Sequence, residues 1–230
     1  MCFRYYVSGR RIIMKLLCIS DIHGEVKYIE SAAHLLADAD IVTISGDISR
    51  SGRRNSAEYV IKQIEQYNPN ILAVHGNWDR IEVCDFLEER GYNLHSNGRI
   101  INDIGFFGVG GSNKTPMKTV SEYAEDDLYD FLMEGYNKVK SARTIVLISH
   151  APPRNYRDRT FLGFRGGSSG IRNFIESHRI DLCISGHIHE AYGIEEFDST
   201  IIANAGTFRK GAFIMVDIEE SITLTTGRVR

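Results

Sequence analysis

Residues 15–24 read KLLCISDIHG, an apolar run of strand length that stops abruptly at Asp21 and His23. Short apolar runs bounded by turn residues are typical of strands buried in a layered α/β sheet. In such sheets the carboxyl ends of the strands converge on one crevice. We therefore expect a buried strand over Lys15–Ser20 and a functional site at its end.

Four further apolar runs end in side chains that can bind a metal ion. They are followed by Gly46-Asp47, by Gly76-Asn77-Trp78-Asp79, by His150 and by Gly186-His187-Ile188-His189. One such motif is weak evidence, because an Asp or Asn there can cap a helix and a lone His is often satisfied by the backbone. Five in succession favour one shared site. The candidate metal ligands are Asp21, His23, Asp47, Asn77, His150, His187 and His189.

These candidates comprise two carboxylates, four imidazoles and one amide. A mixed oxygen and nitrogen set suits Mn, Fe or Zn better than Ca or Mg, and it lacks the thiolates of a structural zinc site. Asp47, on a tight Gly-Asp turn, could bridge two cations. Two ions about 3.5–4 Å apart clamp the attacking and leaving oxygens of a phosphoryl displacement. The pattern therefore indicates two-metal phosphoester chemistry.

The ligands in Asp21-Ile22-His23 and His187-Ile188-His189 lie two residues apart. In extended backbone, both side chains of such a pair point to one side and the isoleucine points into the core. We expect extended backbone at both motifs for this reason.

Short β-branched runs alternate with longer helix-compatible segments, which predicts an α/β layered domain. The expected strands are Lys15–Ser20, Ile41–Ser45, Ile71–His75, Ile104–Val109, Thr144–Ser149, Asp181–Ser185, Thr200–Asn204 and Ala212–Ile218. The expected helices are Val26–Ala37, Asn55–Tyr67, Ile81–Arg90, Ser121–Val139 and Gly170–Ser177. After Ser177 the sequence is typical of successive strands and turns rather than helices. This pattern favours a mixed sheet with a second sheet packed over it. We expect one domain over residues 14–230, preceded by an N-terminal extension over residues 1–13.

Composition limits the partners and the cellular environment that we expect for the protein. The formal charge of −3 and the pI near 6.2 do not indicate a polyanionic partner such as a long nucleic acid. The four cysteines form no close pair, so we expect free thiols and a reducing, cytoplasmic environment. No apolar stretch approaches the roughly 18 residues of a membrane span, and the N-terminus has no signal-peptide pattern.

The set Asp-x-His, Gly-Asp, Gly-Asn-x-Asp, His and Gly-His-x-His resembles the motifs of the calcineurin-like metallophosphoesterases, from about Lys15 to beyond Gly206. The resemblance implies a four-layer α-β-β-α sandwich of two mixed sheets flanked by helices. It implies one metal on Asp21, His23, Asp47 and His189, and another on Asp47, Asn77, His150 and His187. A hydroxide bridging the two ions would be the nucleophile, with Asn77 and His150 as catalytic residues. Asn204-Ala205-Gly206 and the ending His187-Ile188-His189-Glu190 are similar to the small phosphodiesterase-like branch.

Trp78 departs from the family pattern, in which a histidine often follows the Asn and protonates the leaving alkoxide. An indole N–H cannot do this, and general acid catalysis is typically worth about 10²–10⁴ in rate. We therefore expect small phosphodiesters with activated leaving groups to be better substrates than alkyl monoesters, unless His75 or Tyr156 supplies the proton. Trp78 could also stack on a substrate ring.

The long segment His150–Ser169 contains several arginines, of which Arg154 and Arg165 are candidate phosphate-binding residues. A solvated basic loop explains them equally well. Two other functions also stay open at this point. The same fold can act as a catalytically weak metal-binding scaffold for protein interactions, or as a nuclease whose basic loop grips a strand.

Overall fold

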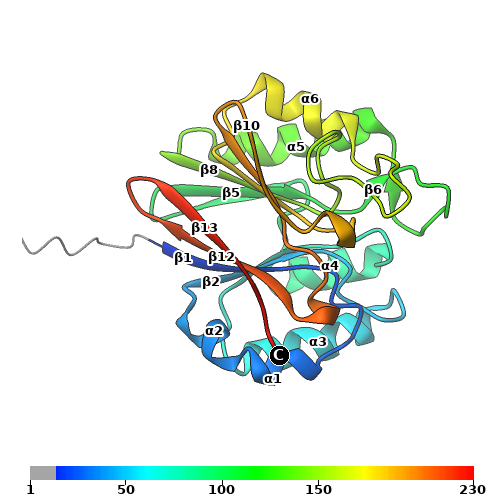
Figure 1. Ribbon diagram of the computed structural model, residues 1–230, viewed down its shortest axis with the longest axis vertical. Coiled ribbons are helices and arrows are strands. Elements are labelled where there is room, and N and C mark those ends of the chain that lie inside the picture. The colour runs from blue at the N-terminus through cyan, green and yellow to red at the C-terminus, as the bar shows by residue number, and fades with distance from the viewer. Residues whose placement is uncertain (1–13) are drawn as a thin grey trace, which may run out of the picture.

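The computed structural model describes residues 14–230, and their backbone forms two large sheets between two layers of helices (Figure 1). The predicted four-layer sandwich is confirmed. The expected extension over residues 1–13 lies outside the described residues. None of the described helices has the length and apolar character needed to cross a membrane.

The first sheet carries the site-forming strands of the N-terminal half. Its order is β13-β12-β1-β2-β3, with β1, β2 and β3 parallel and β12 antiparallel to β1. The strands are β1 (Met14–Ile19), β2 (Ile41–Ser45), β3 (Ile71–Val74), β12 (Ala212–Ile218) and β13 (Ile222–Arg228). Parallel pairing brings the ends of β1, β2 and β3 to one edge of the sheet.

The second sheet is built from strands in the middle of the chain, between Asn97 and Asn204. Its order is β10-β11-β9-β8-β5-β4, with β5, β8, β9 and β11 parallel. The strands are β4 (Asn97–Ile101), β5 (Ile104–Val109), β8 (Thr144–Ser149), β9 (Leu182–Ser185), β10 (Gly193–Phe197) and β11 (Thr200–Asn204). A two-residue ladder joins β6 (Ser112–Asn113) to β7 (Glu122–Tyr123).

Helices cover the outer face of each sheet, as Figure 1 shows. The first sheet is covered by α1 (Lys27–Ser31), α2 (Ala33–Asp38), α3 (Arg54–Glu65) and α4 (Ile81–Glu89). The second is covered by α5 (Glu125–Val139) and α6 (Ser169–Ser177). Short 3₁₀ turns follow at η1 (His189–Ala191) and η2 (Phe208–Lys210).

Strand β1 explains why its sequence is an unbroken apolar run. Leu17 and Ile19 pack against the helices, whereas Leu16 and Cys18 pack between the two sheets. Successive side chains of a strand point to opposite faces, so a strand covered on both faces is apolar throughout. The polar residues begin where the strand ends, and Ser20 and Asp21 are themselves still buried.

Two expected helices differ in the structure. The helix expected over Val26–Ala37 is broken at Ala32, whose φ of −88° and ψ of 2° separate α1 from α2. The helix expected from Ser121 begins only at Glu125, because Glu122 and Tyr123 form β7 and the Asp127 carboxylate accepts a hydrogen bond from the Ala124 N–H. No expected strand covered β4, β10 or β13, which lie at sheet edges and are partly exposed.

Candidate metal centre

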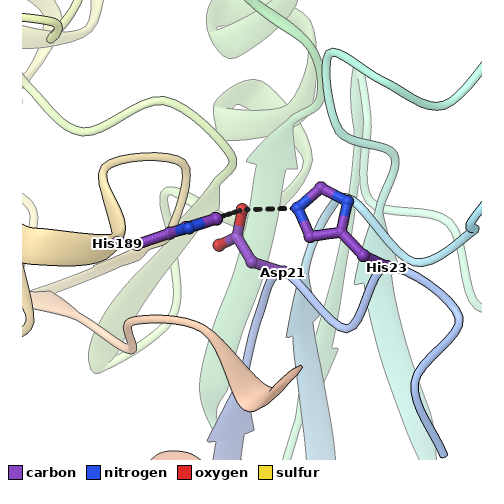
Figure 2. Close-up of side chains that lie close together, drawn as sticks. All are labelled: Asp21, His23 and His189. Atoms are coloured by element: carbon purple, nitrogen blue, oxygen red, sulfur yellow. Dashed lines mark hydrogen bonds and ion pairs between the residues drawn. The ribbon is translucent and has the colours of Figure 1, made fainter. Parts of the chain in front are cut away.

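The ends of β1 and β9 bring Asp21, His23 and His189 together (Figure 2). Asp21 Oδ1 lies 3.1 Å from His189 Nε2 and 3.9 Å from His23 Nε2. Asp21 is fully buried, whereas both histidines are partly exposed. One ligand atom from each residue falls within 4.8 Å of the others, a spacing that one metal ion could fill.

Asp47, after β2, lies between two histidines. Its Oδ2 is 3.6 Å from His23 Nε2, and its Oδ1 is 3.6 Å from His150 Nε2. Asp21, Asp47 and His150 form a second group within 4.8 Å, all three of them buried. Asp47 thus offers one oxygen to each side of the cluster, as a bridging carboxylate would.

Asn77 and His187 complete the cluster on the side of His150. Asn77 Oδ1 lies 2.7 Å from His150 Nε2, and the rings of His150 and His187 are 5.0 Å apart between centroids. The His187 backbone N–H also donates to Asp21 Oδ2. The structure therefore brings together all seven predicted ligand residues.

Backbone conformation at the ligands differs from the expectation of extended chain. The φ angle lies between 48° and 64° at Asp21, His23, Asp47 and His187. This is the left-handed region of the backbone, which residues other than glycine seldom adopt. The expectation was wrong because each strand ends in a tight turn before the motif is complete. Such strained positions cluster at functional sites, where the surrounding structure enforces them. The isoleucines between the ligands, Ile22 and Ile188, are buried as expected.

Two glycines allow the strand ends to approach this closely. A Cβ on Gly76 would lie 2.0 Å from Asp47 Oδ1, and a Cβ on Gly46 would lie 2.5 Å from His150 Nδ1. Gly46 also has a φ of 90°. Any larger residue at either position would displace a predicted ligand.

Asp79 supports the cluster without belonging to it. This fully buried carboxylate accepts hydrogen bonds from the backbone N–H groups of Ile48, Ser49 and Gly76, and from the Ser49 hydroxyl. It thereby ties the turn after β2 to the turn after β3. Its place in the Gly76–Asp79 motif was the only sequence signal for this role.

A second supporting contact orients Asn77. Its Nδ2 donates to Thr119 Oγ1 at 2.8 Å, which leaves Oδ1 facing His150. The Thr119 hydroxyl donates to Glu122 Oε1 at 2.6 Å. Nothing in the sequence pattern singled out Thr119 or Glu122, because they lie in or next to the two-residue strand β7, some 40 residues away.

A cavity of about 730 Å³ opens onto the cluster. It is lined by His23, Asp47, Asn77, His187 and His189, and by Trp78 and Arg165. Trp78 is 47% exposed there. Arg165 also pairs with the buried Asp158 carboxylate, whereas the exposed Arg154 does not line the cavity.

The two alternative proton donors do not reach this cavity. His75 is fully buried, where desolvation lowers its pKa well below the usual range, and its Nε2 lies 3.1 Å from the Tyr123 hydroxyl. Tyr156 stacks on Phe197 with 4.5 Å between centroids. Neither residue lines the cavity, so neither stands in for the missing histidine at position 78.

Residues 14–191 match the family model of the calcineurin-like phosphoesterases. The chain belongs to this family. An uncharacterized protein of Methanocaldococcus jannaschii, MJ1162, is 36% identical over 197 residues, which cover 83% of this chain and 87% of that protein. Membership makes the chain a metal-dependent phosphoesterase of the dinuclear type, as its motifs predict.

Two solved structures share the fold of this phosphoesterase. A dimetal phosphatase from Danio rerio has a TM-score of 0.63 at 11% identity, over 96% of this chain and 98% of its own. An archaeal phosphodiesterase has a TM-score of 0.55 at 20% identity, over 93% of this chain and 100% of its own. At these identities the likeness establishes the fold alone.

The charge balance of the cluster fits the two divalent cations that this phosphoesterase family implies. Burial, together with the negative charges of Asp21 and Asp79, raises the pKa of Asp47 well above its usual value. Burial also opposes ionisation of Asp21, but the hydrogen bond from His189 and the charge of nearby histidines keep the pKa of Asp21 below its usual value. Two buried carboxylates this close need positive charge between them to ionise together.

The histidine tautomers fit cations as well. His150 Nδ1 lies 2.7 Å from the Ser45 carbonyl, which can only accept, so Nδ1 carries the hydrogen. The neutral ring then points a lone pair from Nε2 toward Asn77 Oδ1 and Asp47 Oδ1, which are themselves acceptors. Burial lowers the pKa of His187 to about 3, which also favours a neutral ring. Converging lone pairs without a hydrogen between them are the surroundings of a metal ion.

Proposed function

We propose that this phosphoesterase hydrolyses a small phosphodiester with two divalent transition-metal ions, and that manganese is the native metal, with Fe, Zn or Ni as alternatives. The observation that carries the proposal is the position of Asp47, with one carboxylate oxygen 3.6 Å from His23 and the other 3.6 Å from His150. This arrangement supports a carboxylate shared by two ions.

In this proposal Asp21, His23, Asp47 and His189 hold one ion, and Asp47, Asn77, His150 and His187 hold the other. The proximity of all seven side chains supports this assignment. When bound, the ions would acidify a bridging water, supply the attacking hydroxide near neutral pH and polarise the phosphoryl oxygens.

The residues of the chain then position the phosphoester. Asn77 directs its Oδ1 toward the cluster. One hydrogen of its Nδ2 is donated to Thr119, and the other is free to contact a phosphoryl oxygen. His150 is held by the Ser45 carbonyl, so its Nε2 stays directed at Asp47 and Asn77. Arg165 lies on the cavity wall, where its charge favours an anionic substrate.

A preference for substrates with good leaving groups, such as activated diesters, follows from position 78. Trp78 lines the cavity where a general acid would stand, and neither His75 nor Tyr156 lines the cavity with it. A substrate whose leaving group needs no proton loses least from this arrangement. We further propose that residues 14–230 act as one catalytic unit, because both sheets contribute ligands. A reducing, cytoplasmic setting is supported by the three buried free cysteines among them.

The test is hydrolysis of bis-p-nitrophenyl phosphate and p-nitrophenyl phosphate by metal-stripped protein, with Mn, Ni, Zn and Mg added back in turn. We expect metal-dependent turnover that favours the diester and is greatest with Mn. Stoichiometric metal binding with no turnover would contradict the proposal and favour a scaffold. Salt-sensitive binding of DNA or RNA with cleavage would favour a nuclease.

A further inference from the structure

The cavity that opens onto the metal cluster has a second, apolar half. Nine large apolar side chains are exposed among residues 14–230, and five of them line this one cavity. Scattered exposed apolar residues are ordinary, but a contiguous group in a cavity marks a binding surface. The five side chains, which we call the apolar wall, are Trp78, Met117, Phe161, Leu162 and Phe164.

One side of the apolar wall is a small turn that holds its side chains outward. The Thr160 N–H donates to the Phe164 carbonyl, and the Gly163 N–H donates to the Thr160 carbonyl, both at 2.9 Å. At the base of this turn the Arg165 guanidinium pairs with the buried Asp158. Phe161, Leu162 and Phe164 are 85%, 75% and 71% exposed as a result. The segment is thus built to present apolar surface.

The facing side comes from the segment between β6 and β7. Met117 is 71% exposed there, and Glu122 holds the segment by accepting hydrogen bonds from Thr115 and Thr119. Figure 1 shows this segment and the loop after β8 projecting at the same side of the molecule, and both line the cavity. An open apolar groove therefore leads away from the cluster.

Of the polar side chains that line this cavity, three threonines are bonded within the protein, whereas the buried Asn113 Oδ1 has no hydrogen-bond partner. The hydroxyls of Thr115 and Thr119 donate to Glu122, and the Thr160 hydroxyl donates to the Phe164 carbonyl. Met117, Leu162 and the two phenylalanines offer no donor or acceptor in their side chains. The apolar wall itself therefore suits a hydrocarbon chain, which needs no such partner.

We propose that the substrate is an amphiphilic phosphodiester, whose phosphate lies on the metal cluster and whose alkyl chain lies along the apolar wall. This inference rests on the proposed phosphodiester hydrolysis and adds the class of substrate. Lys114 lines the same cavity and adds positive charge for an anionic head group, and Arg165 lines it too, with its guanidinium paired to Asp158. A volume of about 730 Å³ is far more than a phosphate needs and lies in the range of sites for drug-sized ligands.

Trp78 gives a direct readout of binding, because it is the only tryptophan of the chain and belongs to the apolar wall. Zinc-loaded protein is titrated with methyl-, butyl- and octylphosphonate, which carry the anionic head group and no ester to cleave, below their micelle concentrations. We expect the Trp78 emission to shift to the blue with butyl- and octylphosphonate only. The apparent Kd should fall about two- to fourfold for each methylene that contacts the groove. Equal Kd values for methyl- and octylphosphonate would overturn the proposal.

Substitutions separate the groove from nonspecific contact with hydrocarbon. The double variant Phe161→Ser/Phe164→Ser should lose most of the chain-length dependence and still bind methylphosphonate as the parent does. Tyr59→Ser, on the exposed face of α3, removes another exposed aromatic residue outside the cavity and should change neither. A chain-length dependence that survives the double variant, or falls equally with Tyr59→Ser, would overturn the assignment to the apolar wall.

A kinetic series distinguishes failure of this inference from failure of the proposed function. The substrates are methyl, butyl and octyl p-nitrophenyl phosphate, with manganese-loaded protein. We expect kcat/KM to rise with chain length in the parent and to stay level in Phe161→Ser/Phe164→Ser. Hydrolysis of all three substrates at one rate would contradict the proposed groove and would still support the phosphodiesterase. If none of the three substrates is hydrolysed but phosphonate binding still depends on alkyl chain length, the phosphodiesterase is contradicted and the groove is supported.

Discussion

Asn77 donates a hydrogen bond from Nδ2 to Oγ1 of Thr119, at 2.8 Å, across 42 residues of sequence. This bond decides which end of the amide faces His150. Thr119 is held by Glu122, which is also bonded by Thr115. The segment that forms one side of the apolar wall therefore also orients a proposed metal ligand.

Thr119→Val should weaken the cluster by freeing the Asn77 amide to rotate. Loss of a residue that orients a metal ligand typically costs about 10–100-fold in metal affinity or activity, and we expect a loss in that range. Metal titration and hydrolysis of bis-p-nitrophenyl phosphate measure it. Thr115→Val is the matched control, because Thr115 bonds the same Oε1 of Glu122 but not Asn77. Equal losses in the two variants would mean that Thr119 acts only through the fold of the segment.

Asp79→Asn should destabilise the fold whether or not metal is present. The Asp79 carboxylate accepts four hydrogen bonds with no exposure, and an amide would turn an N–H toward at least one of those donors. We expect a loss of about 2–4 kcal/mol in the free energy of unfolding, measured by urea denaturation of metal-stripped protein. Asp38→Asn, which removes an exposed ion pair with Lys15, should cost under about 1 kcal/mol. A loss that small for Asp79→Asn would contradict its structural role.

Trp78→His should restore a general acid at the cavity wall. We expect hydrolysis of alkyl monoesters, whose alkoxide leaving group needs a proton, to rise about tenfold or more, with a smaller change on p-nitrophenyl phosphate and bis-p-nitrophenyl phosphate, whose leaving group needs none. Comparison of kcat for the two substrate classes measures the effect. Trp78→Phe is the control, since it opens space without adding a proton donor. An equal gain in both variants would assign the parent's preference to steric exclusion by the indole.

Thiol reactivity checks the buried cysteines. Burial raises the pKa of Cys18, Cys84 and Cys183 to about 12, so at pH 8 each is a protonated thiol and a poor nucleophile. Because only the thiolate reacts, labelling by iodoacetamide at pH 8 should stay slow until the protein unfolds, and raising the pH should speed it. Peptide mapping of native and urea-treated samples measures this site by site. Rapid native labelling at Cys18 or Cys183 at pH 8 would contradict the packing described for β1 and β9.

Much of the fold and site could be predicted from local sequence. Strands β2, β5, β8, β11 and β12 have the expected bounds, because each is a mostly apolar run that ends at turn residues. Edge strands such as β13 alternate exposed and half-exposed residues, and such short alternation resembles loop sequence. The proximity of the seven candidate ligands followed from a topological rule, since parallel strands end at one edge.

The rest depended on contacts between distant segments. Left-handed backbone at Asp21 and His187 cannot be read from residue type, because neither is glycine. The role of Thr119 depends on a segment that packs against the end of β3 only in the folded chain. Of the apolar wall, only Trp78 was expected to contact substrate. Its other members were missed, since Phe161, Leu162 and Phe164 form no periodic pattern and Met117 lies some 45 residues away.

Asp47→Asn tests the central claim most directly. The experiment compares metal content by mass spectrometry, and turnover of bis-p-nitrophenyl phosphate, in the parent, in Asp47→Asn and in the surface control Asp38→Asn. The account predicts two transition-metal ions per chain in the parent and the control, one or fewer in Asp47→Asn, and a fall in turnover of about 10²-fold or more. An Asp47→Asn protein that retains both ions and hydrolyses the diester as fast as the parent would contradict it.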